Sequence, residues 1–215
     1  MTRTTNRWQQ ACAVQQETEG RLKRLIGMGQ GSAQRAALAR LRRGIGRRPG
    51  ELPELWGILL DGLPQDMQSY RLDEPSRAEW AIYTALTVFA LHQQGRDVLR
   101  QSAHVPGVSL GTAAQRLAAR LPGELADKRE RVARRFNQVA TADTMQELAH
   151  YLRAFVQLLR ANDLALDYAL LARDLFCYQF DDGAAGVRLR WGQDFYADKT
   201  ENKEDADNAQ TENGD

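Results

Sequence analysis

Residues 76–94 read SRAEWAIYTALTVFALHQQ, and this stretch indicates the class of structure. Its large apolar side chains stand nearly all round the axis that a helix would have: Trp80, Tyr83, Leu86, Val88, Phe89 and Leu91. A helix that is apolar on every side has to be buried, so we expect this one to form the centre of the N-terminal half. Pro75 stands where a first-turn proline belongs, and Gly95 closes the helix.

Further helices are expected on the N-terminal side of this segment. The first covers about 6–26 and ends at the glycine-rich break 27–31, which we interpret as a flexible connector. Ser32 caps the second helix, SAQRAALARLRRG, and a short apolar helix, LPELWGILL, follows at 52–60. The alternation of apolar and polar residues that is typical of a strand is absent, and β-branched residues are sparse.

Five more helices are expected on the C-terminal side, at 109–121, 124–140, 144–161, 168–180 and 184–196. Apolar residues recur at helical spacing in three of them: Leu125, Val132, Phe136 and Val139; Leu148, Leu152, Phe155 and Leu159; and Val187, Trp191 and Phe195. Asp143 with Gln146 three residues later predicts a capping box, and Asp167 opens the next helix.

The pattern as a whole predicts an all-α protein of two packed helical bundles with about eight to nine helices. We expect an N-terminal bundle over 1–100 and a C-terminal bundle over 101–197, because 96–108 is less regular. No apolar run is long enough to span a membrane, and no signal peptide is recognisable. Cys12 and Cys177 lie far apart and suggest no disulfide framework, so we expect a cytoplasmic protein.

The net charge of +1 hides a basic body and an acidic end. Residues 198–215 contain seven acids and two lysines, a net charge of −5, which leaves +6 on the rest of the chain. Beyond Tyr196 no apolar residue larger than alanine occurs, so we expect 198–215 to be a disordered acidic C-terminal tail. A second interpretation is that this tail competes with nucleic acid for the basic surface.

The sequence offers few residues for catalysis or metal binding. The histidines have no second ligand three or four residues away, and neither Cys-x-x-Cys nor His-Glu-x-x-His occurs. The glycine stretch GMGQGS lacks the Gly-Lys-Ser/Thr of a phosphate-binding loop. Paired carboxylates stand at expected helix edges, where capping and solvation explain them: Asp73-Glu74 and Asp181-Asp182. We therefore expect no enzymatic activity, no metal and no cofactor.

Arginine supplies almost all of the positive charge and gathers on three expected helices, each with an apolar side behind it. The second helix carries Arg35, Arg40, Arg42, Arg43 and Arg47; the helix near 130 carries Lys128, Arg129, Arg131, Arg134 and Arg135; and the next carries Arg153 and Arg160 on the face of His150 and Gln157. Solvated helix faces usually mix the two signs of charge, and here acids are few. Arginine binds phosphate in a bidentate way, so the faces predict a surface that holds nucleic-acid backbone.

The order of five segments resembles the CasB family, the small subunit of the type I-E CRISPR Cascade complex. These segments are LARLRRGIGRRPGELPELW, AIYTALTVFALHQ, GVSLGTAAQRL, the run RRFNQVATADTMQELAHYLRAFVQLLRANDLALDYALLARDL, and VRLRWGQDFY. They lie within about 32–196. The N-terminal extension is longer than in the family, and the acidic tail has no counterpart in it.

The resemblance implies a non-catalytic, all-helical subunit that binds target-strand backbone and the displaced strand without sequence preference and so stabilises the R-loop. It implies contacts with guide RNA, with the guide-RNA-bearing backbone subunits, with the large subunit, and with a second copy of the chain. Combined with the basic faces, it gives these candidate nucleic-acid-binding residues: Arg40, Arg42, Arg43, Lys128, Arg131, Arg134, Arg135, Arg153 and Arg160.

Two other functions fit parts of the pattern. A helical structural adaptor would use its basic faces to bind acidic protein partners and would leave DNA unbound. A metal-dependent nuclease would need several scattered acids to converge in the fold and would cleave DNA when magnesium or manganese is added.

Overall fold

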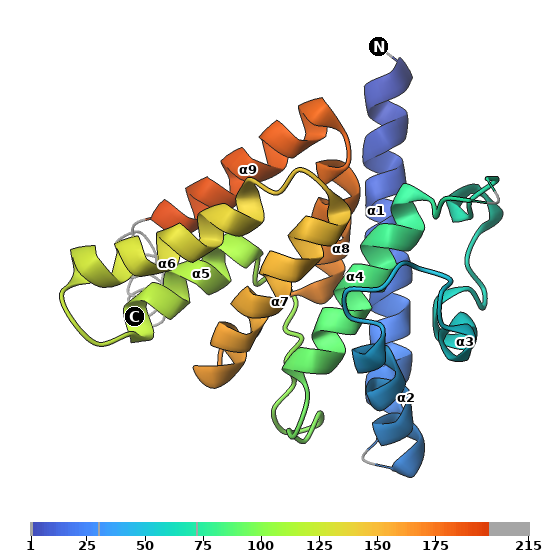
Figure 1. Cartoon of the computed structure of the whole chain (residues 1–215), viewed down its shortest axis with the longest axis horizontal. Coiled ribbons are helices and arrows are strands. Elements are labelled where there is room, and N and C mark those ends of the chain that lie inside the picture. Colours follow the sequence, from blue (N-terminus) through green and yellow to red (C-terminus); the bar gives the residue numbers. More distant parts are fainter. Residues whose placement is uncertain (1, 30, 72, 198–215) are drawn as a thin grey trace, which may run out of the picture.

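The structure, a computed structural model, describes residues 2–29, 31–71 and 73–197, and of residues 2–6 it describes the backbone alone. Within these ranges the chain forms nine α-helices and no strand, which confirms the all-α prediction (Figure 1). The predicted disorder of 198–215 concerns residues outside the described ranges. The helices are α1 (Thr2–Gly27), α2 (Ser32–Arg43), α3 (Trp56–Leu59), α4 (Arg77–His92), α5 (Leu110–Arg120), α6 (Leu125–Ala140), α7 (Met145–Ala161), α8 (Tyr168–Tyr178) and α9 (Asp181–Tyr196).

Helix α4 is the central element, as its apolar sequence predicts. Every residue from Ala81 to His92 is buried. The helix packs against α1 and α2 on one side and against α7 and α8 on the other (Figure 1), so it serves both halves of the chain. The apolar side chains of the described residues form one continuous core. The division near residue 100 stays a prediction.

The start of α4 differs from the prediction. Ser76, the residue directly after Pro75, is the N-cap: its hydroxyl accepts a hydrogen bond from the backbone N–H of Glu79 at 3.0 Å. The Glu79 carboxylate in turn accepts one from the backbone N–H of Ser76 at 2.7 Å, which completes a capping box. Pro75 therefore precedes the helix and does not lie in its first turn.

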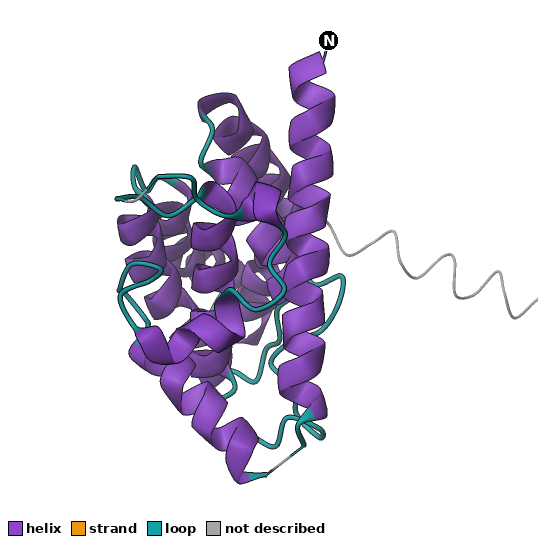
Figure 2. Cartoon of the chain, turned by 90° about the vertical axis from the view of Figure 1, so that its right-hand side faces the viewer, coloured by secondary structure: helices purple, strands orange, loops and turns teal. Residues whose placement is uncertain are grey.

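Helix α1 lies along one side of the molecule (Figure 2) and packs most extensively on α8. The helix begins at Thr2, earlier than the predicted start near residue 6. Arg21 is 1% exposed, and its guanidinium donates to the carbonyl of Leu59 at 3.0 Å and pairs with the Glu17 carboxylate at 2.6 Å. These bonds fix α3 against α1, because a buried guanidinium is costly unless it is fully paired.

The predicted apolar stripes of α6, α7 and α9 meet in an aromatic cluster. The centre of the Phe136 ring lies 5.6 Å from the ring centre of Phe155, 6.2 Å from that of Trp191 and 5.5 Å from that of Phe195. Asp174 is buried beside the cluster and accepts a hydrogen bond from the Trp191 indole at 2.7 Å. Burial raises the pKa of Asp174, while the Arg190 guanidinium at 2.7 Å lowers it in part.

Three local predictions need correction. Leu125 does not join the stripe of α6 but is 56% exposed, because it is the first residue of the helix and lies beyond the reach of the core. Thr144 caps α7, with its hydroxyl accepting from Glu147 N–H at 3.1 Å, one position later than the predicted box. Helix α2 has Gly31 at its N-cap, and Ser32 is its first residue. Among the described residues, no helix has both the length and the apolar character that a membrane crossing requires.

Candidate nucleic-acid interface

The arginines of α2 are exposed because the opposite side of that helix is buried. Leu38 and Leu41 pack into the core, which turns Arg40 and Arg43 to solvent and leaves Arg42 half-buried. Arg43 forms an ion pair with Glu54 at 3.3 Å. Neither Arg40 nor Arg42 forms an ion pair within the described part of the chain.

The predicted residues of α6 differ in how strongly the fold engages them. Arg131 donates to the carbonyl of Pro122 at 2.6 Å, and Lys128 donates to that of Ala119 at 3.4 Å. Arg134 pairs with Glu130 at 2.9 Å. Arg135 is exposed, and it makes no hydrogen bond or ion pair with the residues that the structure describes. Of the four, Arg135 is therefore the one with all of its donors available.

Helix α7 contributes Arg153 and Arg160 from the side that faces away from its buried stripe. Leu148, Leu152 and Phe155 are at most 1% exposed, which confirms the predicted core face. Arg153 is exposed, and Arg160 in the last turn is half-buried.

The fold brings Arg160 of α7 together with Arg42 of α2. Burial lowers the pKa of Arg42, and the positive charge of Arg160 lowers it further. Neither guanidinium forms an ion pair with an acidic side chain of the described residues, so the two positive charges repel each other. Coulomb repulsion of this kind is relieved when an anion lies between the two groups.

Two adjoining grooves surround this pair. The first has a volume of about 360 Å³ and is lined by Gln34, Arg35, Leu38, Arg42 and residues 93–97. The second has a volume of about 410 Å³ and is lined by residues 94–96, Gln157, Arg160 and Ala161. We call the two together the α2–α7 groove. Asp97 also lines the first groove, and its carboxylate accepts from the backbone N–H of Leu99 at 2.9 Å and lies 3.6 Å from Arg100.

Arg96 is part of the α2–α7 groove and was missed by the sequence analysis. Its guanidinium donates to the backbone carbonyl of Arg160 and pairs with Asp163 at 2.9 Å. It therefore holds the C-terminal end of α7 in place and orients Arg160. The segment 96–108 shows no periodicity, so no signal in the sequence could have marked Arg96.

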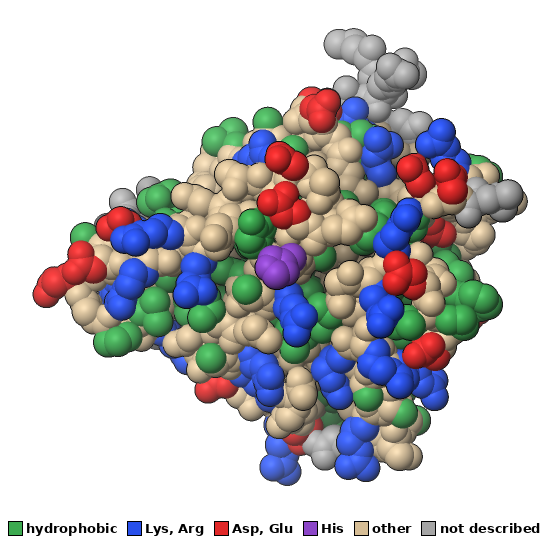
Figure 3. Space-filling view, in the orientation of Figure 1, with side chains coloured by type: hydrophobic (Ala, Val, Ile, Leu, Met, Phe, Trp, Pro, Cys, Tyr) green, Lys and Arg blue, Asp and Glu red, His purple; other side chains and the backbone are tan. Residues whose placement is uncertain are grey.

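The basic residues form two groups instead of one surface. Figure 3 shows Lys and Arg side chains gathered on the lower part of the molecule, over α2, the end of α4 and α7, with another group over α6 at the left. Acidic side chains on this face are more frequent in its upper part (Figure 3). The structure thus brings Arg42 of α2 and Arg160 of α7 together and leaves the predicted residues of α6 as a separate group.

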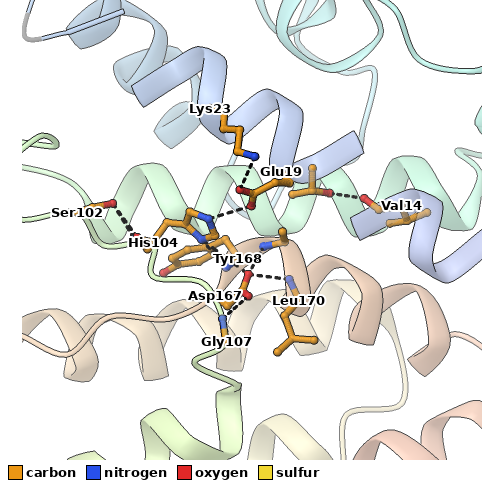
Figure 4. Close-up of polar contacts among 11 residues, drawn as sticks. Val14, Glu19, Lys23, Ser102, His104, Gly107, Asp167, Tyr168 and Leu170 are labelled. Carbon is orange, nitrogen blue, oxygen red and sulfur yellow. Dashed lines mark hydrogen bonds and ion pairs between the residues drawn. The ribbon is translucent and has the colours of Figure 1, made fainter. Parts of the chain in front are cut away.

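One cluster has the composition of a metal site. Donor atoms of Glu19, His104 and Asp167 lie within 4.8 Å of one another (Figure 4). His104 Nε2 lies 3.0 Å from the Glu19 carboxylate, and its Nδ1 accepts from the backbone N–H of Tyr168 at 3.2 Å. Asp167 accepts from Gly107 N–H at 2.8 Å and from two N–H groups in the first turn of α8 at 3.0 and 2.9 Å.

The hydrogen bonds of this cluster explain its geometry without an ion. Asp167 is the N-cap of α8, as predicted, and His104 links that cap to α1 through Glu19. A metal would compete with these hydrogen bonds for the same carboxylate and imidazole atoms. The cluster therefore holds α1, α8 and the segment 102–109 together.

Comparison with known proteins identifies the family. The profile of the CRISPR-associated protein Cse2 family matches residues 37–196. Among solved structures, CasB from Thermobifida fusca is 34% identical, covers 87% of this chain and 97% of its own, and superposes with a TM-score of 0.65. A Cse2-family CRISPR-associated protein from Thermus thermophilus is 25% identical, with coverages of 85% and 97% and a TM-score of 0.61.

A further solved structure, M. ruber CasB, shares the fold at 21% identity and a TM-score of 0.60, with coverages of 88% and 97%. No curated protein matches the chain. The family match extends over most of the chain and agrees with the all-helical architecture and with the resemblance of the five sequence segments. The chain therefore belongs to the Cse2/CasB family, the small subunits of the type I-E CRISPR Cascade complex.

Proposed function

We propose that this Cascade subunit binds nucleic-acid backbone without sequence preference and so stabilises the R-loop formed by guide RNA, target DNA and the displaced strand. The observation that carries the proposal is the α2–α7 groove, where Arg42 and Arg160 approach each other and form no ion pair with an acidic side chain of the described residues. We propose further that the chain meets its partners in Cascade, the backbone subunits, the large subunit and a second copy, through other surfaces.

The chemistry of the groove fits a phosphodiester. Each phosphate of a nucleic acid carries one negative charge, and a guanidinium can hold it through two parallel hydrogen bonds. An anion seated between Arg42 and Arg160 would turn their mutual repulsion into two attractions. Contacts of this type position a strand without distinguishing its bases, which supports binding that does not depend on sequence.

The energy required of such contacts is small. In the related case of Cas9-type effectors, the RNA–DNA heteroduplex formed is about as stable as the DNA duplex that it replaces. A few phosphate contacts can therefore shift the balance towards the open R-loop. Sequence recognition stays with the guide RNA, and a small subunit without catalytic groups is sufficient for this task.

The test is the double variant R42A/R160A, measured by binding of duplex and single-stranded DNA over a range of salt concentrations. Loss of two phosphate contacts should lower the slope of log K against log salt by roughly 1.8 for duplex DNA. The matched control is R71A, which removes an exposed arginine that pairs with Glu74 at 3.3 Å and lies on none of the predicted basic faces. This control should leave binding within about twofold of the parent, since exposed ion pairs contribute little.

Three results separate the alternatives. Unchanged affinity and salt slope in R42A/R160A would refute the role of the groove. If the parent chain fails to shift DNA at low salt but Cascade assembly requires it, the chain is a structural adaptor. Cleavage of DNA on addition of magnesium or manganese would indicate a nuclease, and we expect none.

A further inference from the structure

The α2–α7 groove contains a second pair of guanidinium groups at the C-terminal end of α7. Arg96 and Arg160 both line the half that has a volume of about 410 Å³, and no acidic side chain is among the described residues that line this half. A Cβ on Gly95 would lie 3.7 Å from the guanidinium of Arg160, which places that group beside the backbone next to Arg96. Burial lowers the pKa of His92, and the charges of Arg96 and Arg160 lower it further. The two guanidinium groups therefore belong to one site.

Asp163 is the acidic partner of Arg96. Its Oδ1 lies 2.9 Å from Arg96 Nη2 and accepts a second hydrogen bond from Gln101 Nε2 at 3.1 Å. The side chain of Asp163 is 62% exposed, whereas that of Arg96 is 11% exposed. Within the described part of the chain, Arg96 forms its hydrogen bonds through Nη2 alone. Asp163 therefore neutralises the charge of Arg96 and leaves its other donors open.

The backbone of Asp163 is left-handed. Helix α7 ends at Ala161, Asn162 is its C-cap, and Asp163 follows with a φ of 52°. Of the residues that the structure describes, it is the one non-glycine residue with a positive φ. Glycine is the usual residue at this position after a helix, because it adopts the left-handed conformation without strain. Since glycine would satisfy the backbone, the carboxylate is what aspartate adds here.

From this arrangement we propose that Asp163 sets the affinity of the α2–α7 groove: its carboxylate neutralises Arg96, so the groove holds phosphate less tightly than three uncompensated guanidinium groups would. The inference rests on the proposed function and adds control of affinity to it. A phosphate between Arg42 and Arg160 would meet Arg96, which lines both halves of the groove, and the charge of Asp163 would repel it. Because strand exchange is close to balance, a moderate grip is enough to shift it.

The decisive variant is D163N. Asparagine has nearly the shape of aspartate, tolerates a left-handed backbone, and can still accept a hydrogen bond from Gln101. We expect D163N to bind a single-stranded oligothymidylate about threefold to tenfold more tightly than the parent at low salt, as measured by fluorescence anisotropy. The slope of log K against log salt should become steeper by roughly 0.7, since one more cation meets the strand. Unchanged or weaker binding would overturn the proposal, and a purely structural Asp163 predicts such a result.

A matched control separates this effect from a change in net charge. E74Q removes one negative charge from an exposed carboxylate that pairs with Arg71 at 3.3 Å and does not line the α2–α7 groove. It should leave affinity within about twofold of the parent. A gain from E74Q as large as that from D163N would overturn the proposal.

Two backgrounds test whether the gain acts through Arg96. In R96Q the substitution D163N should give no gain, because the cation that Asp163 neutralises is gone. Any displacement of α7 caused by R96Q is common to both members of this comparison. In R96K, which retains the charge, D163N should again tighten binding. An undiminished gain in R96Q, or no gain in R96K, would contradict the assignment.

A second measurement does not depend on nucleic acid. Inorganic tripolyphosphate is titrated into the parent and into D163N, and the side-chain Nε–H resonances of arginine are followed by NMR. Shifts of Arg96 and Arg160 at a lower midpoint in D163N support the proposal, and equal midpoints or no shift overturn it. If D163N binds tripolyphosphate more tightly while neither chain binds DNA, the proposed function fails and the role of Asp163 stands. If both chains bind DNA equally, the proposed function stands and the role of Asp163 fails.

Discussion

Replacing Arg160 with glutamine separates binding from stability, because two opposing terms act on the fold. R160Q removes the repulsion from Arg42, which for half-exposed groups is worth about 0.2–1 kcal/mol. It also removes a positive charge from the last turn of α7, where a cation interacts favourably with the helix dipole by about 0.3–1 kcal/mol. The two nearly cancel, so we expect the melting temperature to stay within about 2 °C of the parent.

Binding should respond much more strongly than stability. A charge-assisted hydrogen bond contributes about 1.5–3 kcal/mol, and the lower value applies to a half-buried group. R160Q should therefore weaken DNA binding about tenfold, and the salt slope should fall by roughly 0.9 for duplex DNA. Thermal unfolding followed by circular dichroism and fluorescence anisotropy measure the two quantities. A fall of more than about 5 °C in melting temperature would show that Arg160 is structural, and unchanged affinity would show that no phosphate binds there.

Two further predictions concern the core. His92 is fully buried, and burial lowers its pKa from 6.5 to about 3, so the unfolded chain takes up the proton first. The contribution of neutral His92 to the free energy of unfolding is fully present above pH 6.5 and decreases below it, by about 2 kcal/mol at pH 5. H92Q should abolish this part of the pH dependence measured by urea unfolding. An unaltered dependence on pH in the variant would contradict the assignment. A Cβ on Gly111 would lie 2.3 Å from the carbonyl oxygen of Trp191, so G111A should lower the free energy of unfolding by about 1–3 kcal/mol. A Cβ on Gly192 would meet no atom within 4 Å, so G192A should stabilise α9 by about 0.5–1 kcal/mol. Equal unfolding midpoints for the two alanine variants would refute the close approach of α5 and α9.

Periodicity carries most of the information that the sequence contains about this fold. The spacing of Val132, Phe136 and Val139 and the apolar run of α4 correctly identify the buried faces, because burial follows from the geometry of a single helix. Helix ends are harder to place. Asp143 and Thr144 are neighbours of the same capping type, and only the backbone geometry decides that Thr144 is the cap.

The site depends on contacts that no local pattern records. Arg42 and Arg160 approach each other only because α2 and α7 both pack on α4. The ion pairs of Arg43 with Glu54 and of Arg134 with Glu130 show how the fold neutralises individual members of a basic stripe. The stripe could thus be predicted from the sequence, and the availability of each arginine within it could not.

The packing of α1 on α8 has a consequence for the synthesis of the chain. Between Gly27 and Tyr168 lie 140 residues, so α1 leaves the ribosome long before its partner helix exists. Until then its apolar side, with Val14, Leu22 and Leu25, has no surface on which to pack completely. Closing so long a loop is slow compared with forming neighbouring helix pairs. The nascent chain therefore presents an exposed apolar helix to chaperones through most of translation, and the native core closes only when α8 emerges.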